Sequence, residues 1–212
     1  MLKRHLVVVA VLALVAVVPL VAQAPKGWML RADRSTSAAD PDKPGPISFT
    51  ARGSGFHAIT PQAAVFWQPA STVTGNYSLK GTFKLLKPSS HTNYYGLVFG
   101  GSNLEGPAQS YLYFVVAQDG TWLIKRRDGD TSTREVAPRG VSDAVKRPDA
   151  SGQSINALEV RVTADKIDYL ANSRVVHSTP RTGLTMKTDG SYGIRVNHVL
   201  EVQVDGFTVS KQ

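Results

Sequence analysis

Apolar and polar residues alternate with a period of two along most of the chain after residue 47. The clearest run is 76–85, where Tyr77, Leu79, Phe83 and Leu85 alternate with polar side chains. This period is typical of a β-strand with one buried and one exposed face. The other runs of this kind are 64–68, 94–100, 111–118, 121–127, 132–136, 157–163, 166–171, 174–177, 192–197 and 199–210. The pattern predicts an all-β protein, and no sustained helical period interrupts it.

Short turns between these runs predict that consecutive strands are antiparallel. Asp119-Gly120 separates two runs by the two residues of a tight hairpin, in which Gly accepts a positive φ. A second tight hairpin is expected at 171–174, where Asn172 tolerates the left-handed region. Asp205-Gly206 interrupts the last run and predicts a β-bulge. About a dozen short antiparallel strands form a sandwich or a barrel.

Strand parity assigns one set of side chains to the core. The expected core residues are Phe83, Leu85, Leu97, Phe99, Leu112, Phe114, Val116, Leu158, Val160, Val162, Ile167, Tyr169, Ile194, Val196, Leu200, Val202, Val204, Phe207 and Val209. Each contributes roughly 1.5–3 kcal/mol when it is buried, which is enough in sum to stabilise one domain.

The opposite parity carries an unusual combination of aromatic and donor side chains. The candidate ligand contacts on this outward face are Tyr94, Tyr111, Tyr113, Lys125, Arg127, Arg195 and Asn197. Flat rings beside directional donors suit a sugar, because its C–H face is apolar and its hydroxyls need hydrogen bonds. A simpler explanation also exists, since tyrosine is favoured on any strand and these rings could cover a second layer of loops.

The first 24 residues have the pattern of a secretory signal peptide. Lys3 and Arg4 precede the uncharged run 6–22, and small residues allow cleavage after Ala22 or Ala24. The alternative is an uncleaved anchor, although 17 apolar residues are barely enough to span the membrane. After removal of the leader we expect no membrane span. Residues 25–46 then form a Pro-rich lead-in, with one edge strand near Trp28, before a sandwich domain at 47–212.

Composition excludes several classes of chemistry and partner. The chain of 212 residues has no cysteine, which excludes thiol nucleophiles and iron–sulfur clusters. Its formal net charge is +8, and removal of the two basic residues of the leader leaves +6. These charges are scattered over expected strands and loops, so we expect no nucleic-acid partner, whereas attraction to an acidic polymer remains open. We expect a secreted or periplasmic protein.

Several blocks of the chain resemble exported bacterial domains of the concanavalin A-like lectin/glucanase superfamily. The matching blocks are 55–60, 64–67, 75–77, 95–101, 111–114, 193–197 and 204–209. The resemblance covers about residues 47–210 and extends loosely to laminin-G-like and 3-keto-disaccharide hydrolase-like modules. It implies a jelly-roll β-sandwich, an architecture that carries binding modules and enzymes alike.

The residues needed for glycoside hydrolysis are not arranged in the pattern of the laminarinase-type members. Those members carry Glu-x-Asp-x-x-Glu on one strand, whereas Glu105, Glu135, Glu159 and Glu201 are dispersed. The histidines are dispersed as well, and Asp205 is a weak candidate ligand for calcium, with no other cofactor expected. The leading hypothesis is therefore a non-catalytic carbohydrate- or polymer-binding module. The alternatives are a glycoside hydrolase-like enzyme and an envelope protein-interaction module.

Overall fold

The computed structural model describes residues 24–33 and 42–212. Except for residue 24, the expected signal peptide lies outside the described residues, and so do residues 34–41 of the expected lead-in. Within the described part, no helix is both long enough and apolar enough to cross a bilayer.

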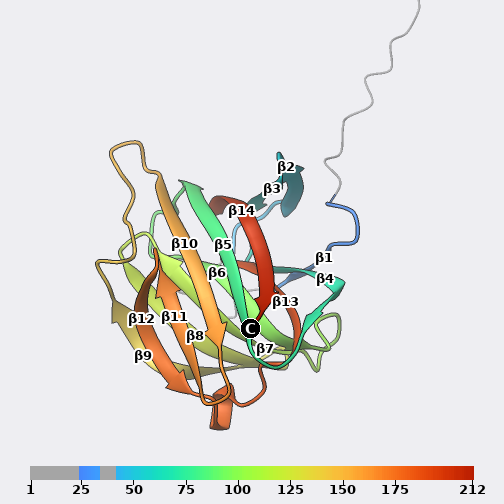
Figure 1. Cartoon of the computed structure of the whole chain (residues 1–212). Coiled ribbons are helices and arrows are strands. Elements are labelled where there is room, and N and C mark those ends of the chain that lie inside the picture. The colour runs from blue at the N-terminus through green and yellow to red at the C-terminus, as the bar shows by residue number, and fades with distance from the viewer. Residues whose placement is uncertain (1–23, 34–41) are drawn as a thin grey trace, which may run out of the picture.

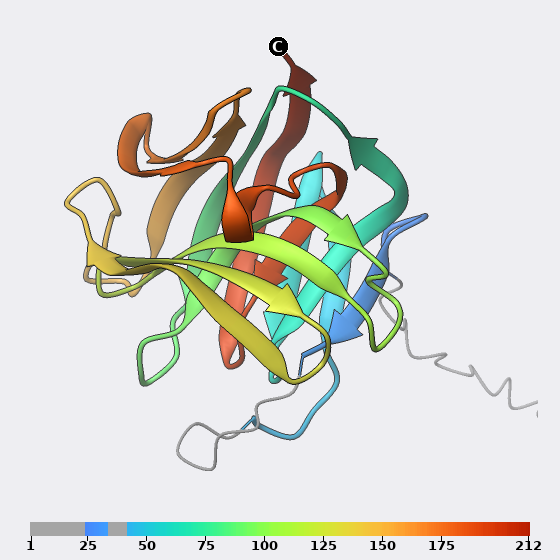
Figure 2. The same ribbon diagram turned by 90° about the horizontal axis from the view of Figure 1, so that it is seen from below.

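The described residues form two seven-stranded antiparallel sheets that face each other (Figures 1 and 2). Sheet A has the order β1 (Met29–Ala32), β4 (Ala64–Val73), β13 (Gly190–Val196), β6 (Tyr94–Ser102), β7 (Ser110–Ala117), β8 (Thr121–Asp128) and β9 (Ser132–Val141). Sheet B has the order β12 (Arg174–Pro180), β11 (Lys166–Ala171), β10 (Ser154–Val162), β5 (Tyr77–Lys87), β14 (Leu200–Lys211), β3 (Gly55–Thr60) and β2 (Ser48–Arg52). The predicted antiparallel sandwich is confirmed.

The strands differ from the predicted runs mainly near the N-terminus. The edge strand expected in the lead-in is β1, which pairs with β4. Strands β2 and β3 pair with each other at one edge of sheet B and lie outside the predicted runs. The two strands contribute only three apolar side chains to the core, Phe49, Phe56 and Ala58, and Gly53-Ser54-Gly55 interrupts the alternation of apolar and polar residues. Each segment is therefore too short to be identified by its periodicity.

The main core lies between the sheets and contains the predicted residues. All 19 lie in this core or pack against it, with Phe207 and Val209 only partly buried at its margin. Aromatic rings from both sheets meet inside the core, and Phe114 of β7 lies 5.5 Å from Tyr169 of β11 between ring centroids. Strand parity therefore predicted the interior face of both sheets correctly.

The predicted bulge in β14 determines where its last apolar residues point. The register between β14 and β5 shifts between Asp205 and Thr208, where Gly206 has φ 60°. The extra residue reverses the parity, so that Phe207 follows Val204 on the interior side, against Gly81 of β5. A Cβ on Gly81 would lie 3.1 Å from the Phe83 ring and 3.5 Å from the Phe207 ring, so the glycine lets the two rings pack closely over β5.

His177 packs at the end of the sandwich opposite β1 and gives a first testable prediction. Its ring stacks on Trp122 with centroids 4.9 Å apart, and burial lowers the pKa of His177 below its ordinary 6.5. The unfolded chain therefore binds a proton more readily, so this group destabilises the fold as the pH falls through 6.5. In urea unfolding at pH 7.5 and pH 5, the wild type should lose more unfolding free energy than His177→Gln. Equal losses would contradict this assignment.

Candidate functional site

The predicted contact residues gather on the outer face of sheet A, as their parity required. The pairing registers place Tyr111 opposite Arg127 and Tyr113 opposite Lys125 on β7 and β8. Arg195 of β13 lies opposite Gly96 of β6, on the same face. The structure thus brings residues from distant parts of the sequence onto one surface.

The three tyrosines of this set are buried, as is Arg195, which corrects the expectation of an exposed aromatic face. Tyr111 is 0% exposed, and Tyr94 and Tyr113 are each 7% exposed. They belong to a second apolar cluster on this side of sheet A, together with Val65, Trp67, Val98, Leu104, Val115 and Ala117. Leu104 reaches this cluster from the connection between β6 and β7, so the rings do cover a layer of loop structure, as the simpler explanation held. Direct contact between these three rings and a ligand stays a prediction, and the rings present almost no surface to solvent.

The polar members of the predicted set surround the carboxylate of Asp33, which lies directly after β1. Arg195 donates from Nη1 to Asp33 Oδ2, and Arg127 Nη2 lies 2.6 Å from Oδ1. The Tyr111 hydroxyl lies 3.5 Å from Oδ2 and accepts a hydrogen bond from Arg195 at 2.9 Å. The Asp33 side chain is only 4% exposed. We call this group of Asp33, Arg127, Arg195 and Tyr111 the carboxylate cluster.

The protonation states in this cluster follow from burial and charge. Burial raises the pKa of Tyr111 above its ordinary value of 10.0, so the phenol stays neutral. Burial by itself lowers the pKa of Arg195, but Tyr111 and Asp33 more than offset this and raise it. With the carboxylate ionised, the cluster holds two positive charges and one negative charge. Of the remaining predicted residues, Asn197 accepts from Arg195 Nε at 3.0 Å, and Lys125 is partly exposed.

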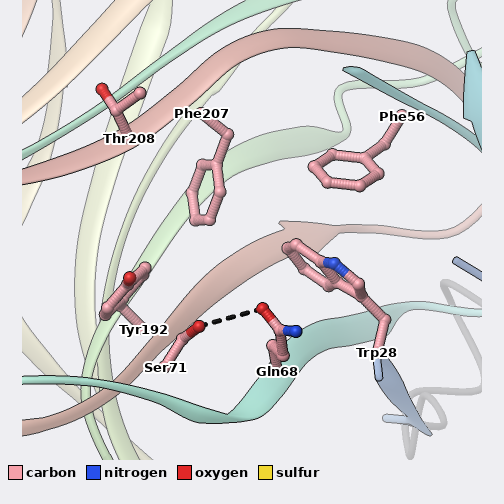
Figure 3. A pocket seen from close by; sticks show the side chains of 7 residues that line it. All are labelled: Trp28, Phe56, Gln68, Ser71, Tyr192, Phe207 and Thr208. Carbon is pink, nitrogen blue, oxygen red and sulfur yellow. Dashed lines mark hydrogen bonds between the residues drawn. The ribbon is translucent and has the colours of Figure 1, made fainter. Parts of the chain in front are cut away.

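A separate pocket lies between the two sheets at the side bordered by β1 and β3. It has a volume of about 200 Å³ and is lined by Trp28, Phe56, Gln68, Ser71, Tyr192, Phe207 and Thr208. Figure 3 shows the four rings around a common space, with Gln68 and Ser71 along one side. The Trp28 ring lies 4.5 Å from Phe56 and 5.8 Å from Phe207, and Phe207 lies 5.9 Å from Tyr192. We call it the aromatic pocket.

Two strand irregularities produce the aromatic pocket. One is the bulge of β14, which turns Phe207 inward. The other is in sheet A, where the register of β13 on β4 steps from Ser191↔Thr72 to Gly193↔Trp67. Tyr192 alone therefore faces the four β4 residues 68–71, and this widened segment carries Gln68 and Ser71.

The polar side chains of the aromatic pocket are held in a defined orientation. The Ser71 hydroxyl donates to Gln68 Oε1 at 3.0 Å, and Figure 3 shows the Nε2 donor of Gln68 on the side of Trp28. All four rings are partly exposed, so a ligand can reach them. None of the seven lining residues carries a formal charge. The pocket thus offers ring faces and hydrogen-bonding groups but no ionic contact.

Sequence reasoning missed the aromatic pocket, although signals for parts of it were present. The sequence indicates only an edge strand near Trp28 in the lead-in. Pro69, directly after the expected strand 64–68, is a mark of a bulge or an edge, because it cannot donate to the ladder. The proximity of Trp28 and Phe207, which are 179 positions apart in the numbering, has no local signal.

The other candidate chemistry is distributed over the molecule. Glu159 and Glu201 lie opposite Lys80 and Lys87 of β5, seven residues apart along that strand, or about 23 Å. This separation far exceeds the 5–9.5 Å or so of a glycosidase pair. Each carboxylate has a cationic or histidine partner of its own, such as the 2.9 Å contact between Glu201 and His57.

The histidines are less dispersed than the sequence indicated, because the Nε2 atoms of His91 and His198 lie 3.2 Å apart. No group of three or more metal-ligating side chains occurs among the described residues. Asp205 accepts from Gln203 at 2.8 Å, and its role in calcium binding stays a prediction.

Comparisons with known proteins identify the fold. No protein-family model matches the sequence, and no curated protein matches it. Among solved structures, the carbohydrate-binding module CBM66 from Bacillus subtilis is similar with a TM-score of 0.61 and 10% identity, over 87% of this chain and 96% of that one. A Bacillus subtilis protein of unknown function with a galectin-like fold has a TM-score of 0.60 and 14% identity, over 88% and 90%.

An enzyme shares the architecture as well. The GH16 protein of a mixed-linkage glucan locus of Bacteroides ovatus, solved with a G4G4G3G product, has a TM-score of 0.57 and 9% identity, over 89% of this chain and 97% of that one. The chain therefore has the jelly-roll β-sandwich fold that these solved structures share. At these identities the likeness extends to the fold alone, and function has to be argued from the site.

Proposed function

We propose that this protein is an exported, non-catalytic module that binds carbohydrate in the aromatic pocket. The observation that carries the proposal is the set of four partly exposed rings around one space with an oriented amide and hydroxyl. Sugar rings pack their C–H faces on aromatic side chains, and their hydroxyls bond to amide groups. The similarity of fold to a carbohydrate-binding module supports this assignment, and the leader pattern supports export.

The chemistry of the pocket favours a neutral sugar unit. No formal charge lines the pocket, so a carboxylate or sulfate placed there would lose hydration without gaining an ionic partner. The basic side chains that give the chain its net positive charge lie outside this pocket. A volume of about 200 Å³ suits one ring or a chain end rather than a long polymer segment.

A glycan array followed by calorimetry tests the proposal. We expect the wild type to bind at least one neutral glycan. Gln68→Ala should weaken that binding about 3- to 10-fold through the lost hydrogen bond, and Phe207→Ala about tenfold or more through the lost ring. Gln203→Ala is the matched control, because this glutamine lies on β14 outside the pocket. Circular dichroism establishes that each variant is folded.

The same experiment separates the alternatives. Unchanged binding in both pocket variants would place the sugar site elsewhere, and the absence of binding to every glycan would favour a protein-interaction module. Shortening of the bound glycan over time, followed by mass spectrometry, would indicate the hydrolase instead. The separation of Glu159 from Glu201 leads us to expect no shortening.

A further inference from the structure

The carboxylate cluster has the form of a receptor for an anion. Two guanidinium groups and one phenol converge on a single carboxylate, and arginine is the side chain best suited to bind carboxylates. The carboxylate comes from Asp33, at the end of the short strand β1. The receptor groups come from the central strands β7, β8 and β13 of sheet A.

The receptor groups are held in place by contacts that do not involve Asp33. Arg127 donates from Nε to the carbonyl of Gly129 at 2.8 Å and from Nη1 to the Thr133 hydroxyl at 3.1 Å. Arg195 donates from Nε to Asn197, and its guanidinium lies 5.0 Å from the centroid of the Tyr113 ring. Each arginine thus presents a terminal nitrogen to the anion from a fixed position. Such preorganisation lowers the entropic cost of binding.

The occupant comes from an edge strand, whereas the receptor groups come from strands that are paired on both sides. Strand β1 has four residues and pairs only with β4. Its Met29 and Leu30 side chains are each 40% exposed, and the strand is anchored by Trp28 before it and by Arg31, which donates to the Gly106 carbonyl at 2.9 Å and pairs with Asp130. The two arginines also leave one positive charge that Asp33 does not neutralise. A ligand with its own carboxylate can therefore compete for the position.

We propose that the carboxylate cluster is a binding site for the carboxylate of an acidic sugar, a hexuronate, and that Asp33 occupies it in the unliganded protein. The site differs from the aromatic pocket in location and in ligand charge, so it extends the proposed function and does not depend on it. Binding of the uronate displaces Asp33 and the end of β1 from the outer face of sheet A. The apparent affinity of the wild type for the uronate is its intrinsic affinity multiplied by the fraction of time that Asp33 leaves the site free.

Calorimetry on the full chain tests this competition. The probes are sodium glucuronate and glucose, and the variants are Asp33→Ala and Asp33→Asn. Asparagine has nearly the same shape as aspartate, so Asp33→Asn is used if Asp33→Ala folds poorly. We expect Asp33→Ala or Asp33→Asn to bind glucuronate at least tenfold more tightly than the wild type. Glucose binding should show no gain of this size. Adding Arg195→Met to either variant should abolish the gain.

Matched measurements give the result that would overturn the proposal. Asp168→Ala is the control, because it removes a carboxylate of similar burial from the opposite sheet and should leave glucuronate binding unchanged. Glucuronate should also raise the melting temperature of Asp33→Asn by about 3 °C or more over glucose at equal ionic strength. If folded Asp33→Asn shows neither the tenfold gain nor the shift, Asp33 is only a structural ion-pair partner. Loss of neutral-glycan binding in Gln68→Ala would be unaffected by that outcome.

Discussion

Replacing Arg195 with methionine is expected to lower the free energy of unfolding by about 3–5 kcal/mol, because the variant leaves the buried Asp33 carboxylate without one of its two cationic partners. Methionine approximates the length of the side chain, so the loss reports mainly on charge and hydrogen bonding. The variant also removes the bonds of Arg195 to Asn197 and to the Tyr111 hydroxyl. Urea unfolding at pH 7 measures the change.

An exposed ion pair provides the control for this variant. Arg174 contacts Asp143 at 3.0 Å, with exposed side-chain fractions of 64% and 80%. Fully exposed ion pairs contribute little to stability, so Arg174→Met should change the free energy of unfolding little. The double variant Arg195→Met/Asp33→Asn should not recover the loss, because Asp33 stays paired with Arg127 in the single variant and its removal deprives Arg127 of that partner. Equal effects of Arg195→Met and Arg174→Met would show that burial does not strengthen the cluster.

Replacing Phe114 with alanine is expected to have an effect of similar size, for a different reason. The ring is 0% exposed and packs against Tyr169 of the opposite sheet, so its loss leaves a cavity at the centre of the sandwich. A change of this kind costs about 3–5 kcal/mol. In a domain of this size that corresponds to a fall in melting temperature of about 6–20 °C, which calorimetry can measure.

Val209→Ala is the comparison for the core variant. Val209 lies at the margin of the main core and is only partly buried, so its truncation removes less apolar surface and leaves a space that water can reach. We expect a clearly smaller loss than for Phe114→Ala. Similar losses would mean that the core does not concentrate between β7 and β11.

Strand parity in the sequence was sufficient to predict which side chains form the interior, but not which side chains on the outer face of sheet A are exposed. Phe114 and Tyr113 were assigned to opposite faces correctly, because alternation depends only on the backbone. Whether an outward tyrosine meets solvent depends on what else packs there, and Leu104 comes from a connection without regular spacing. Likewise, no pattern places Asp33 of the lead-in between Arg127 and Arg195, since ion pairing across long separations leaves no periodic signal.

Of the two bulges that form the aromatic pocket, the sequence predicted one and gave only a weak signal for the other. Asp205-Gly206 indicated the bulge of β14, because this pair of residues suits a positive φ within a strand. The bulge of β4 opposite Tyr192 involves four residues, and Pro69 alone gave a signal for it. Predicting the pocket would have required both bulges and the pairing order of the sheets.

Strand β1 links two regions that lie on different sides of sheet A. Trp28, just before it, forms part of the wall of the aromatic pocket, and Asp33, just after it, fills the carboxylate cluster. Displacement of one end of so short a segment alters the restraint on the other. If uronate displaces Asp33 as proposed, occupancy of the two regions is thermodynamically linked, and any change that an anionic ligand makes in the affinity for a neutral ligand is matched by the same factor in reverse.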